Sequence, residues 1–389
     1  MSRSTCTRPV SSAPSTSARP AVIAHRGASG HRPENTLAAY ELAARMGADR
    51  IEPDVVPTCD GVLVLRHESE LSGSTDVASR SELADRRTTR EVEGRPVTGW
   101  FTEDLTFAEV RSLRAVEPHP LVRPATTAHD GRHQVPTFGE LLALAERLRA
   151  ELGRHLVVTA EVKEPARYAA AGLDVAALVL QQLRASGVDV TSPGTPEAPA
   201  PVALQCFEPA FLRRLRAEGV ELPLVQLVDD DELGRWLCTP AGLREVSTYA
   251  EVLAPSKDMV LPVTADGALG AATSLVADAH AASLAVHVYT LRDENVHLPP
   301  ALRLGEVADA PGRALAEHLA FLDAGVDGVF TDHPGTGVQA RALWLAGREG
   351  AARVATGAMP AVPAAAAAPV PVPASPGRQR TPAAVPART

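Results

Sequence analysis

Short apolar and β-branched runs alternate along this chain with longer stretches of helical periodicity. The runs have strand length and are bounded by turn residues, which predicts strands at Ala21–His25, Arg50–Val55, Leu156–Lys163, Val202–Phe207, Leu222–Leu227, Val252–Pro255, Ala285–Leu291 and Val326–Asp332. Helices are predicted between most of them, at Thr36–Met46, Phe138–Leu152, Val175–Ser186, Pro209–Glu218, Ala241–Tyr249, Ala265–Ala282 and Ala314–Ala324. Eight strands with intervening helices indicate an α/β fold of the TIM (β/α)8 barrel type.

A ninth apolar run, Val62–His67, interrupts this alternation. Only Pro57–Gly61, which ends in an Asp-Gly turn signal, separates it from the second predicted strand. A parallel return needs a crossover of about a dozen residues or more, so this connection should be an antiparallel hairpin. Folding about the turn brings His67 back beside Glu52 and Asp54.

The two ends of the chain differ in composition from its middle. Residues 1–19 are rich in Ser, Thr and Pro and are expected to form a flexible leader. Residues 351–389 are an Ala/Pro-rich tail that is expected to be disordered. No linker divides residues 20–350, which favours one catalytic barrel domain.

The amino-acid composition narrows the kinds of molecule that this protein is expected to bind. Apolar residues make up 45 % of the 389-residue chain, and the formal net charge of −9 leaves no basic footprint for nucleic acid. The four cysteines are scattered, without a Cys-x-x-Cys pair. No stretch reaches the roughly 20 apolar residues of a membrane-spanning helix, and the first residues lack the apolar core of a signal peptide. As written, the sequence predicts a cytoplasmic protein; a longer true start would instead allow a secreted or periplasmic one.

Polar residues gather at the carboxyl ends of the predicted strands, the face on which TIM barrels carry their active sites. They are His25, Arg26, Glu52, Asp54, His67, Glu161 and Lys163. Glu52 and Asp54 are two residues apart on one strand, so both side chains point to one side. With Glu161 they offer three carboxylates, an all-oxygen set that suits a divalent cation, Ca²⁺ in preference to Mg²⁺, rather than Zn²⁺.

The remaining polar residues suit phosphate chemistry. Arg26 offers a planar fork for a phosphate group, and Lys163 can meet an anionic group. His25 and His67 can divide general acid and general base work near neutral pH. The alternative is a buried ion network without chemistry, which the convergence of all these groups on one barrel face disfavours. Asn35, at the start of a predicted helix, is interpreted as its N-cap.

An ordered series of motifs resembles the glycerophosphodiester phosphodiesterase family. The motifs are His25–Gly27, Pro33–Thr36, Gly47–Val55, Thr58–Gly61 with His67, Glu161–Lys163 and Gly325–Asp332. The resemblance runs from about Val22 to Arg341. His67-Glu68, followed by Thr75–Val77 and Gly99–Asp104, resembles the larger, often exported branch of the family.

The resemblance implies a TIM barrel with a helical or irregular insertion after the hairpin, here residues 71–136. It also implies metal binding by Glu52, Asp54 and Glu161, acid–base catalysis by His25 and His67, and phosphate binding by Arg26 and Lys163. Two positions depart from the family pattern, because Glu68 stands where an aspartate is usual and Tyr289 where a tryptophan is common.

The predicted reaction is the metal-dependent hydrolysis of a small-molecule glycerophosphodiester to sn-glycerol 3-phosphate and an alcohol. His67 is preferred as the base and His25 as the acid. Two alternatives stay open: a phosphodiesterase directed at lysophospholipids, of the lysophospholipase D type, and a non-catalytic barrel that binds phosphodiesters. The insertion carries an apolar stretch around Trp100, which we interpret as a lid that encloses a glycerol moiety and limits lipid tails.

Overall fold

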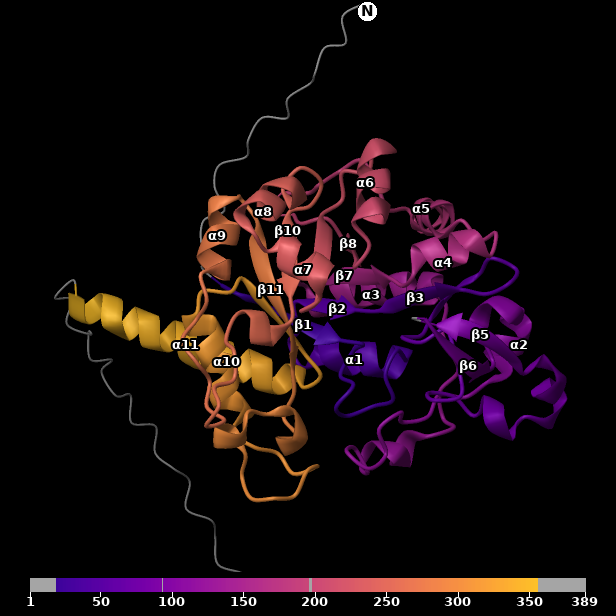
Figure 1. Ribbon diagram of the computed structural model, residues 1–389, viewed down its shortest axis with the longest axis horizontal. Helices are drawn as coiled ribbons and strands as arrows, with labels where there is room; N and C mark the ends of the chain where they lie inside the picture. Colours follow the sequence, from indigo (N-terminus) through magenta and orange to yellow (C-terminus); the bar gives the residue numbers. More distant parts are fainter. Residues whose placement is uncertain (1–18, 93, 196–197, 356–389) are drawn as a thin grey trace, which may run out of the picture. The chain divides into compact units, whose positions relative to one another are not determined.

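The computed structural model describes residues 19–92, 94–195 and 198–355, and its main sheet is a closed parallel barrel (Figure 1). In order around the barrel, the strands are β1 (Ala21–His25), β2 (Arg50–Glu52), β7 (Val157–Val162), β8 (Val202–Cys206), β9 (Leu224–Val228), β10 (Val252–Pro255), β11 (Ala285–Leu291) and β12 (Gly328–Thr331). β12 pairs in parallel with β1 and so closes the ring. The prediction of a TIM barrel is confirmed.

The second predicted strand is divided at Pro53, which has no N–H group to donate to a sheet. Its second part, β3 (Asp54–Pro57), pairs in parallel with β7 and antiparallel with β4 (Leu63–Leu65). The predicted hairpin is therefore confirmed. Because β4 runs back toward the carboxyl ends of the barrel strands, His67 follows it on the same face as the site.

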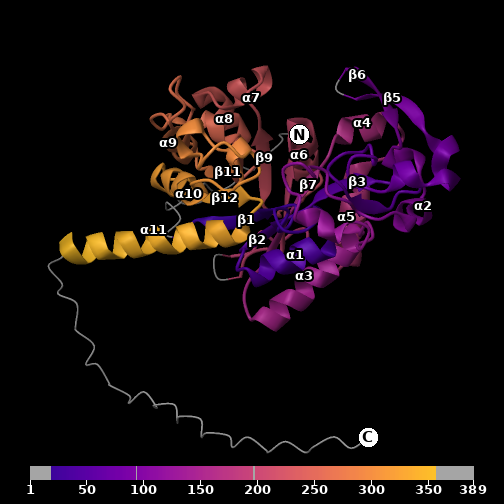
Figure 2. The ribbon, with the colours of Figure 1, turned by 90° about the horizontal axis from the view of Figure 1, so that it is seen from below.

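Helices cover the outside of the barrel, with α1 and α3 beside each other on one side (Figures 1 and 2). Six helices lie near their predicted bounds: α1 (Leu37–Arg45), α3 (Phe138–Leu152), α5 (Val175–Ala185), α6 (Pro209–Ala217), α8 (Pro240–Val246) and α10 (Ala314–Asp323). Three more helices were not predicted: α4 (Pro165–Ala170), α7 (Glu232–Leu237) and α11 (Pro334–Ala355). Between β10 and α10 the chain also forms short 3-10 helices, namely η5 (Lys257–Met259), η6 (Asn295–His297) and η7 (Pro300–Leu302).

The helix predicted at Ala265–Ala282 is wrong in its first half. Gly267 has a φ of +81°, in the left-handed region, and its N–H donates to the Thr264 carbonyl at 2.8 Å to close a turn. The helix α9 (Leu275–Ala281) begins only after this turned segment. Apolar spacing alone therefore extended the helix across a glycine turn.

The barrel encloses a small apolar cluster of its own. Its buried members are Ile23, Val225, Leu227, Val252, Ala254 and Phe330. Val225 and Leu227 on β9, like Val252 and Ala254 on β10, are two residues apart. Alternate side chains of a strand point to one side, so both members of each pair face the barrel interior. Leu227 and Phe330 also line the pocket at the carboxyl ends of the strands, so the pocket has an apolar floor.

The insertion, residues 71–136, is mostly irregular and packs beside β3 (Figures 1 and 2). It contains η1 (Val77–Ser79), η2 (Ser81–Arg86), the antiparallel strands β5 (Thr88–Val92) and β6 (Arg95–Gly99), η3 (Thr102–Asp104), α2 (Phe107–Ser112) and η4 (Thr126–His129). Trp100 is 9 % exposed, and its Nε1–H donates to the Leu83 carbonyl at 2.7 Å. This tryptophan therefore belongs to the core of the insertion.

Contacts divide the chain into one unit up to Ala346 and a second from Gly347 onward. The helix α11 continues to Ala355, past the expected start of the tail at residue 351. The leader before Arg19 and the tail after Ala355 lie outside the described residues, so both expectations stay predictions. No helix within the described ranges is both long and apolar enough to cross a bilayer.

Candidate active site

Three carboxylates meet where β2 ends, where β3 begins and near the carboxyl end of β7. Asp54 lies opposite Glu161 in the parallel pairing of β3 with β7, and Glu52 ends the neighbouring β2. One oxygen from each side chain lies within 4.8 Å of the other two, and all three residues are buried. The prediction that these carboxylates converge is confirmed.

Asn35 holds this cluster in place. Its Nδ2–H donates to Asp54 Oδ2 at 2.8 Å, and its Oδ1 accepts from the Asp54 backbone N–H at 3.1 Å and from the Tyr40 hydroxyl at 2.5 Å. Its interpretation as an N-cap is wrong, because Thr36 caps α1 by accepting from the Ala39 N–H at 3.2 Å. The left-handed φ of +55° at Asn35 turns its side chain away from the helix and toward the carboxylates.

Glu52 is held by neutral donors only. Its Oε2 accepts from the Arg26 backbone N–H at 2.9 Å, and its Oε1 accepts from Gln205 Nε2 at 3.0 Å. Within the described part of the chain, no cationic side chain forms an ion pair with it. Burial, together with the charges of Asp54 and Glu161, raises the pKa of Glu52 well above its ordinary value.

Lys163 lies between the other two carboxylates. Its Nζ is 2.6 Å from Glu161 Oε1 and 3.1 Å from Asp54 Oδ1. Although burial works against it, the charges of Lys163 and Arg26 hold the pKa of Asp54 well below its ordinary range. Burial nevertheless raises the pKa of Glu161, since one lysine serves two carboxylates. The cluster is short of positive charge, and its buried oxygen donors fit a hard divalent cation.

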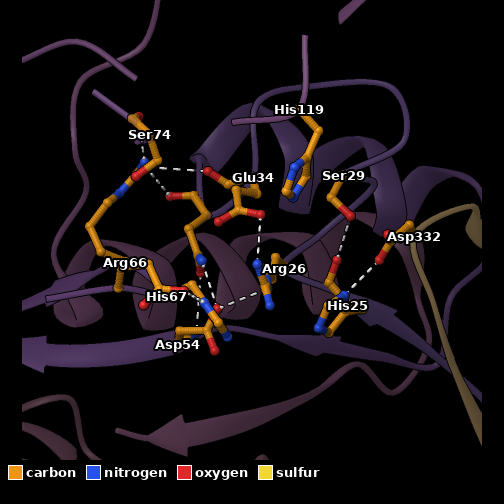
Figure 3. A network of polar contacts seen from close by, with 12 residues as sticks. His25, Arg26, Ser29, Glu34, Asp54, Arg66, His67, Ser74, His119 and Asp332 are labelled. Carbon is orange, nitrogen blue, oxygen red and sulfur yellow. Dashed lines mark hydrogen bonds and ion pairs between the residues drawn. The ribbon is translucent and has the colours of Figure 1, made fainter. Parts of the chain in front are cut away.

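Arg26 approaches the cluster from the turn after β1. Its Nη1–H donates to Glu34 Oε2 at 2.8 Å, and its Nε lies 3.3 Å from Asp54 Oδ2 (Figure 3). Burial opposes the charge of this guanidinium, but Glu34, Asp54 and Glu52 raise its pKa above the usual value. Arg26 therefore keeps a full positive charge at the edge of the pocket.

His25 is fixed by a carboxylate from the last barrel strand. Its Nδ1 lies 2.6 Å from Asp332 Oδ1, which orients the other ring nitrogen away from that partner (Figure 3). Burial, followed by the charge of Arg26, lowers the pKa of His25 to about 4 despite the opposing effect of Asp332. This imidazole is therefore neutral at neutral pH.

His67 follows the hairpin and is the more open of the two rings. Its Nδ1 lies 2.6 Å from Glu68 Oε1, and its side chain is 29 % exposed. Glu68, the residue that departs from the family pattern, thus still supplies the carboxylate partner of this histidine. The hairpin brings His67 to the carboxylates, as predicted.

These side chains surround one pocket of about 270 Å³. Its walls include six of the seven predicted site residues, namely His25, Arg26, Glu52, His67, Glu161 and Lys163, while Asp54 lies directly behind them. Tyr289 also lines the pocket. The other lining residues were not singled out from the sequence, namely Gln205, Phe207, Leu227, Ser256, Lys257, Asp258, Thr290, Arg292 and Phe330. No described residue of the insertion lines this pocket, but Val92 lines an adjoining hollow that shares His67, Glu161, Lys163 and Phe207 with it.

Sequence reasoning also missed the role of Asp332. It accepts from His25 and from two arginines, and it is 2 % exposed. Gln205, near the end of β8, was missed as a partner of Glu52 in the same way. Both residues stand at strand carboxyl ends, and this position was the signal that could have found them.

Comparison with known proteins gives a consistent result. The sequence model of the Glycerophosphoryl diester phosphodiesterase family matches residues 25–336. A glycerophosphodiester phosphodiesterase of Arabidopsis thaliana, GDPD6, is 31 % identical over 339 residues, which cover 83 % of this chain and 86 % of the relative. The glycerophosphodiester phosphodiesterase of Haemophilus influenzae is 28 % identical and covers 82 % of this chain and 88 % of its own length.

Solved structures share the fold. An Oleispira antarctica phosphodiesterase in complex with the product sn-glycerol-3-phosphate superposes with a TM-score of 0.56 at 20 % identity, over 83 % of this chain and 96 % of that one. A glycerophosphodiester phosphodiesterase from Agrobacterium tumefaciens gives a TM-score of 0.51 at 19 % identity, over 82 % of this chain and 98 % of that one.

Proposed function

The chain belongs to the glycerophosphodiester phosphodiesterase family, whose members are phosphoric diester hydrolases that release glycerol 3-phosphate, and we propose how its pocket carries out this reaction. One observation carries the proposal. Three buried carboxylates, short of positive charge, face the same pocket as two histidines that each have a carboxylate partner. Because the family consists of hydrolases, the alternative of a non-catalytic binding barrel is set aside.

Glu52, Asp54 and Glu161 would hold the cation. A hard cation bound there would neutralise phosphate oxygens and polarise the attacking hydroxyl group. Ca²⁺ is favoured because it accepts six to eight oxygen ligands in flexible geometry, which leaves positions for the substrate beside three carboxylates. Mg²⁺ remains the second candidate cation.

Arg26 and Lys163 are proposed to bind the phosphate. Both are cations on the pocket wall, with side chains 14 % and 12 % exposed, and both are paired with carboxylates of the cluster or with Glu34. Their charges are therefore preorganised where the transferring phosphoryl group gathers negative charge. Because Nη1 of Arg26 donates to Glu34 and Nε faces Asp54, Nη2 is the donor left for a phosphate oxygen.

The two histidines are proposed to exchange protons with the substrate. His25 is neutral at neutral pH because its pKa lies near 4, so it suits the base that takes the proton from the attacking hydroxyl group. His67, which is the more exposed ring, suits the acid that protonates the departing alkoxide. This assignment reverses the one preferred from the sequence. The attacking oxygen belongs either to water or to a free glycerol hydroxyl, whose attack would first give a cyclic phosphate that water then opens.

A second substrate class, the lysophospholipids, is supported by an apolar groove beside the pocket. Phe207 and Leu227 line both the pocket and this groove of about 360 Å³. Beyond them the groove is walled by Val228, Leu233 and Leu237, and Glu208, Asp229 and Asp231 also line it. It lies on the side of α6 and α7 rather than beside the insertion. An acyl chain on the diester could leave the pocket through it.

The test is release of glycerol 3-phosphate from glycerophosphocholine by the purified protein. We expect turnover with Ca²⁺ or Mg²⁺, loss of turnover in EDTA, and recovery when the cation is restored. Undiminished turnover in excess chelator would refute the metal role, and no release with any cation would refute the activity.

The groove is tested with lysophosphatidylcholine as a second substrate. Leu233→Glu should lower kcat/KM for this lipid and leave that for glycerophosphocholine unchanged. Leu343→Glu, at a similarly exposed leucine on α11, is the matched control. An equal effect of the two variants on the lipid would remove the groove from substrate binding.

A further inference from the structure

One side chain of the insertion reaches the catalytic histidine through an intermediate. Arg123 stands just before η4, and its side chain is 5 % exposed. Its Nη2–H donates to Asp332 Oδ2 at 2.5 Å, its Nε–H to Glu294 Oε1 at 2.7 Å, and its Nη1–H to the Ser29 carbonyl at 3.3 Å. All three nitrogens of its guanidinium therefore donate to residues outside the insertion.

These contacts enclose His25 from two directions. Asp332 uses its Oδ1 for His25 and its Oδ2 for Arg123, so the arginine fixes the rotation of the carboxylate that orients the imidazole. Ser29, whose carbonyl accepts from Arg123, donates its hydroxyl to the His25 carbonyl at 2.9 Å (Figure 3). Both the ring and the backbone of His25 are therefore tied to the same guanidinium.

Arg292 alone does not supply this constraint. Its Nε–H also donates to Asp332 Oδ2, at 2.7 Å, but its side chain is 26 % exposed and lines the pocket. Arg123 is instead anchored by Glu294, which is itself buried and accepts from it at 2.7 Å. A carboxylate held by a buried, anchored partner keeps its orientation better than one held by a mobile side chain.

We propose that Arg123 is a positioning residue for His25 that acts through Asp332, so that the insertion serves turnover by ordering a catalytic histidine. This inference rests on the role of His25 proposed above. The lid interpretation of the insertion stays a prediction beside it, since Val92 of the insertion lines a hollow that also contains His67, Glu161 and Lys163.

The experiment compares Arg123→Met with Arg111→Met. Arg111 also joins the insertion to the barrel, through a two-pronged ion pair with Glu140 on α3, but it has no hydrogen bond to Asp332 or Ser29. With glycerophosphocholine, Arg123→Met should lower kcat by roughly 10- to 100-fold with little change in KM, because misplacing a reacting group costs rate rather than binding. Arg123→Lys should recover part of kcat, whereas Arg111→Met should keep it. Equal kcat losses in the two methionine variants would overturn the proposal.

A double-mutant cycle tests the route. If Arg123 acts through Asp332, adding Arg123→Met to Asp332→Asn should cost little beyond Asp332→Asn alone. Full additivity of the two losses would place the effect of Arg123 elsewhere and overturn the proposal.

Proton NMR separates this inference from the proposed function. The short hydrogen bond between His25 Nδ1–H and Asp332 should give a low-field proton signal, assigned by its loss in His25→Ala. In folded Arg123→Met, with a retained melting transition, that signal should shift or broaden, whereas Arg111→Met should leave it unchanged. A changed signal in a protein without diesterase activity would keep the positioning role and refute the function. An unchanged signal together with an unchanged kcat in Arg123→Met would overturn the positioning role alone.

Discussion

Replacing Glu52 by glutamine should change stability in opposite directions with and without a bound cation. The variant keeps the shape of the side chain and removes one charge from the cluster. Gln205 Nε2 donates to Glu52 in the native protein, while Gln205 Oε1 is buried without a hydrogen-bond partner. If the Gln205 amide rotates, its oxygen can accept a hydrogen bond from the new side-chain N–H at position 52. The side-chain oxygen of the variant can still accept from the Arg26 backbone N–H. The hydrogen bonds therefore survive the substitution.

The magnitude follows from the separation of the charges. At 4.8 Å, the longest separation within the cluster, one pair of ionised carboxylates repels by about 3.5 kcal/mol at an effective dielectric constant of about 20. The repulsion that remains in the native protein is smaller, because burial with Asp54 and Glu161 raises the pKa of Glu52 and lets it bind a proton instead. We therefore expect the metal-free variant to gain about 1–2 kcal/mol in the free energy of unfolding.

With the cation present the sign reverses. The variant has lost one of three carboxylate ligands, and about 100-fold weaker binding would remove about 2.7 kcal/mol of cation-linked stability. The net change is a loss of about 1 kcal/mol.

Urea unfolding in EDTA and in saturating Ca²⁺ measures both states. Glu317→Gln is the control, since this fully buried glutamate pairs with Lys257 at 2.7 Å. It should lose about 1–3 kcal/mol in both buffers, because Lys257, whose side chain is 15 % exposed, would lose its charged partner and keep the His297 carbonyl as a neutral one. Equal destabilisation of Glu52→Gln in both buffers would refute the repulsion argument and the cation site together.

The other predictions concern the histidines and the barrel interior. His25→Ala and His67→Ala should each lower kcat by roughly 10²- to 10⁴-fold with the melting temperature retained, and a near-native kcat would exclude that ring from proton transfer. Burial, and after it the charge of Arg50, lowers the pKa of His287 to about 3. Below pH 6.5 this histidine is therefore protonated in the unfolded chain but stays neutral in the folded one. Its contribution to the free energy of unfolding should fall by about 1.4 kcal/mol per pH unit down to about pH 3, and His287→Gln should remove that slope. Gly328→Ala should cost about 1–3 kcal/mol in urea unfolding, since the new Cβ would lie 2.7 Å from His287 Cδ2; an unchanged midpoint would contradict this packing.

The sequence was sufficient for the features that depend on local order. Apolar runs between turn residues predicted every barrel strand, and the short Pro57–Gly61 connection predicted the antiparallel hairpin that brings His67 to Glu52. These inferences succeed because the alternation of side chains along a strand and the length of a connection leave few possible geometries. Apolar spacing gave a wrong prediction at Ala265–Ala282, where a glycine turn interrupts the predicted helix.

The partners of the site residues were decided only by the closure of the barrel. Asp332 meets His25 across 307 positions of sequence and meets Arg123 across 209. The choice of Thr36 over Asn35 as the N-cap likewise depended on the carboxylate that the neighbouring strands present to Asn35. Periodicity tells which side of a strand a residue faces, but not which residue from another strand or from an insertion will stand opposite it. That pairing is fixed by the register around the closed barrel, where a buried charge is stable only beside the partner that the whole fold supplies.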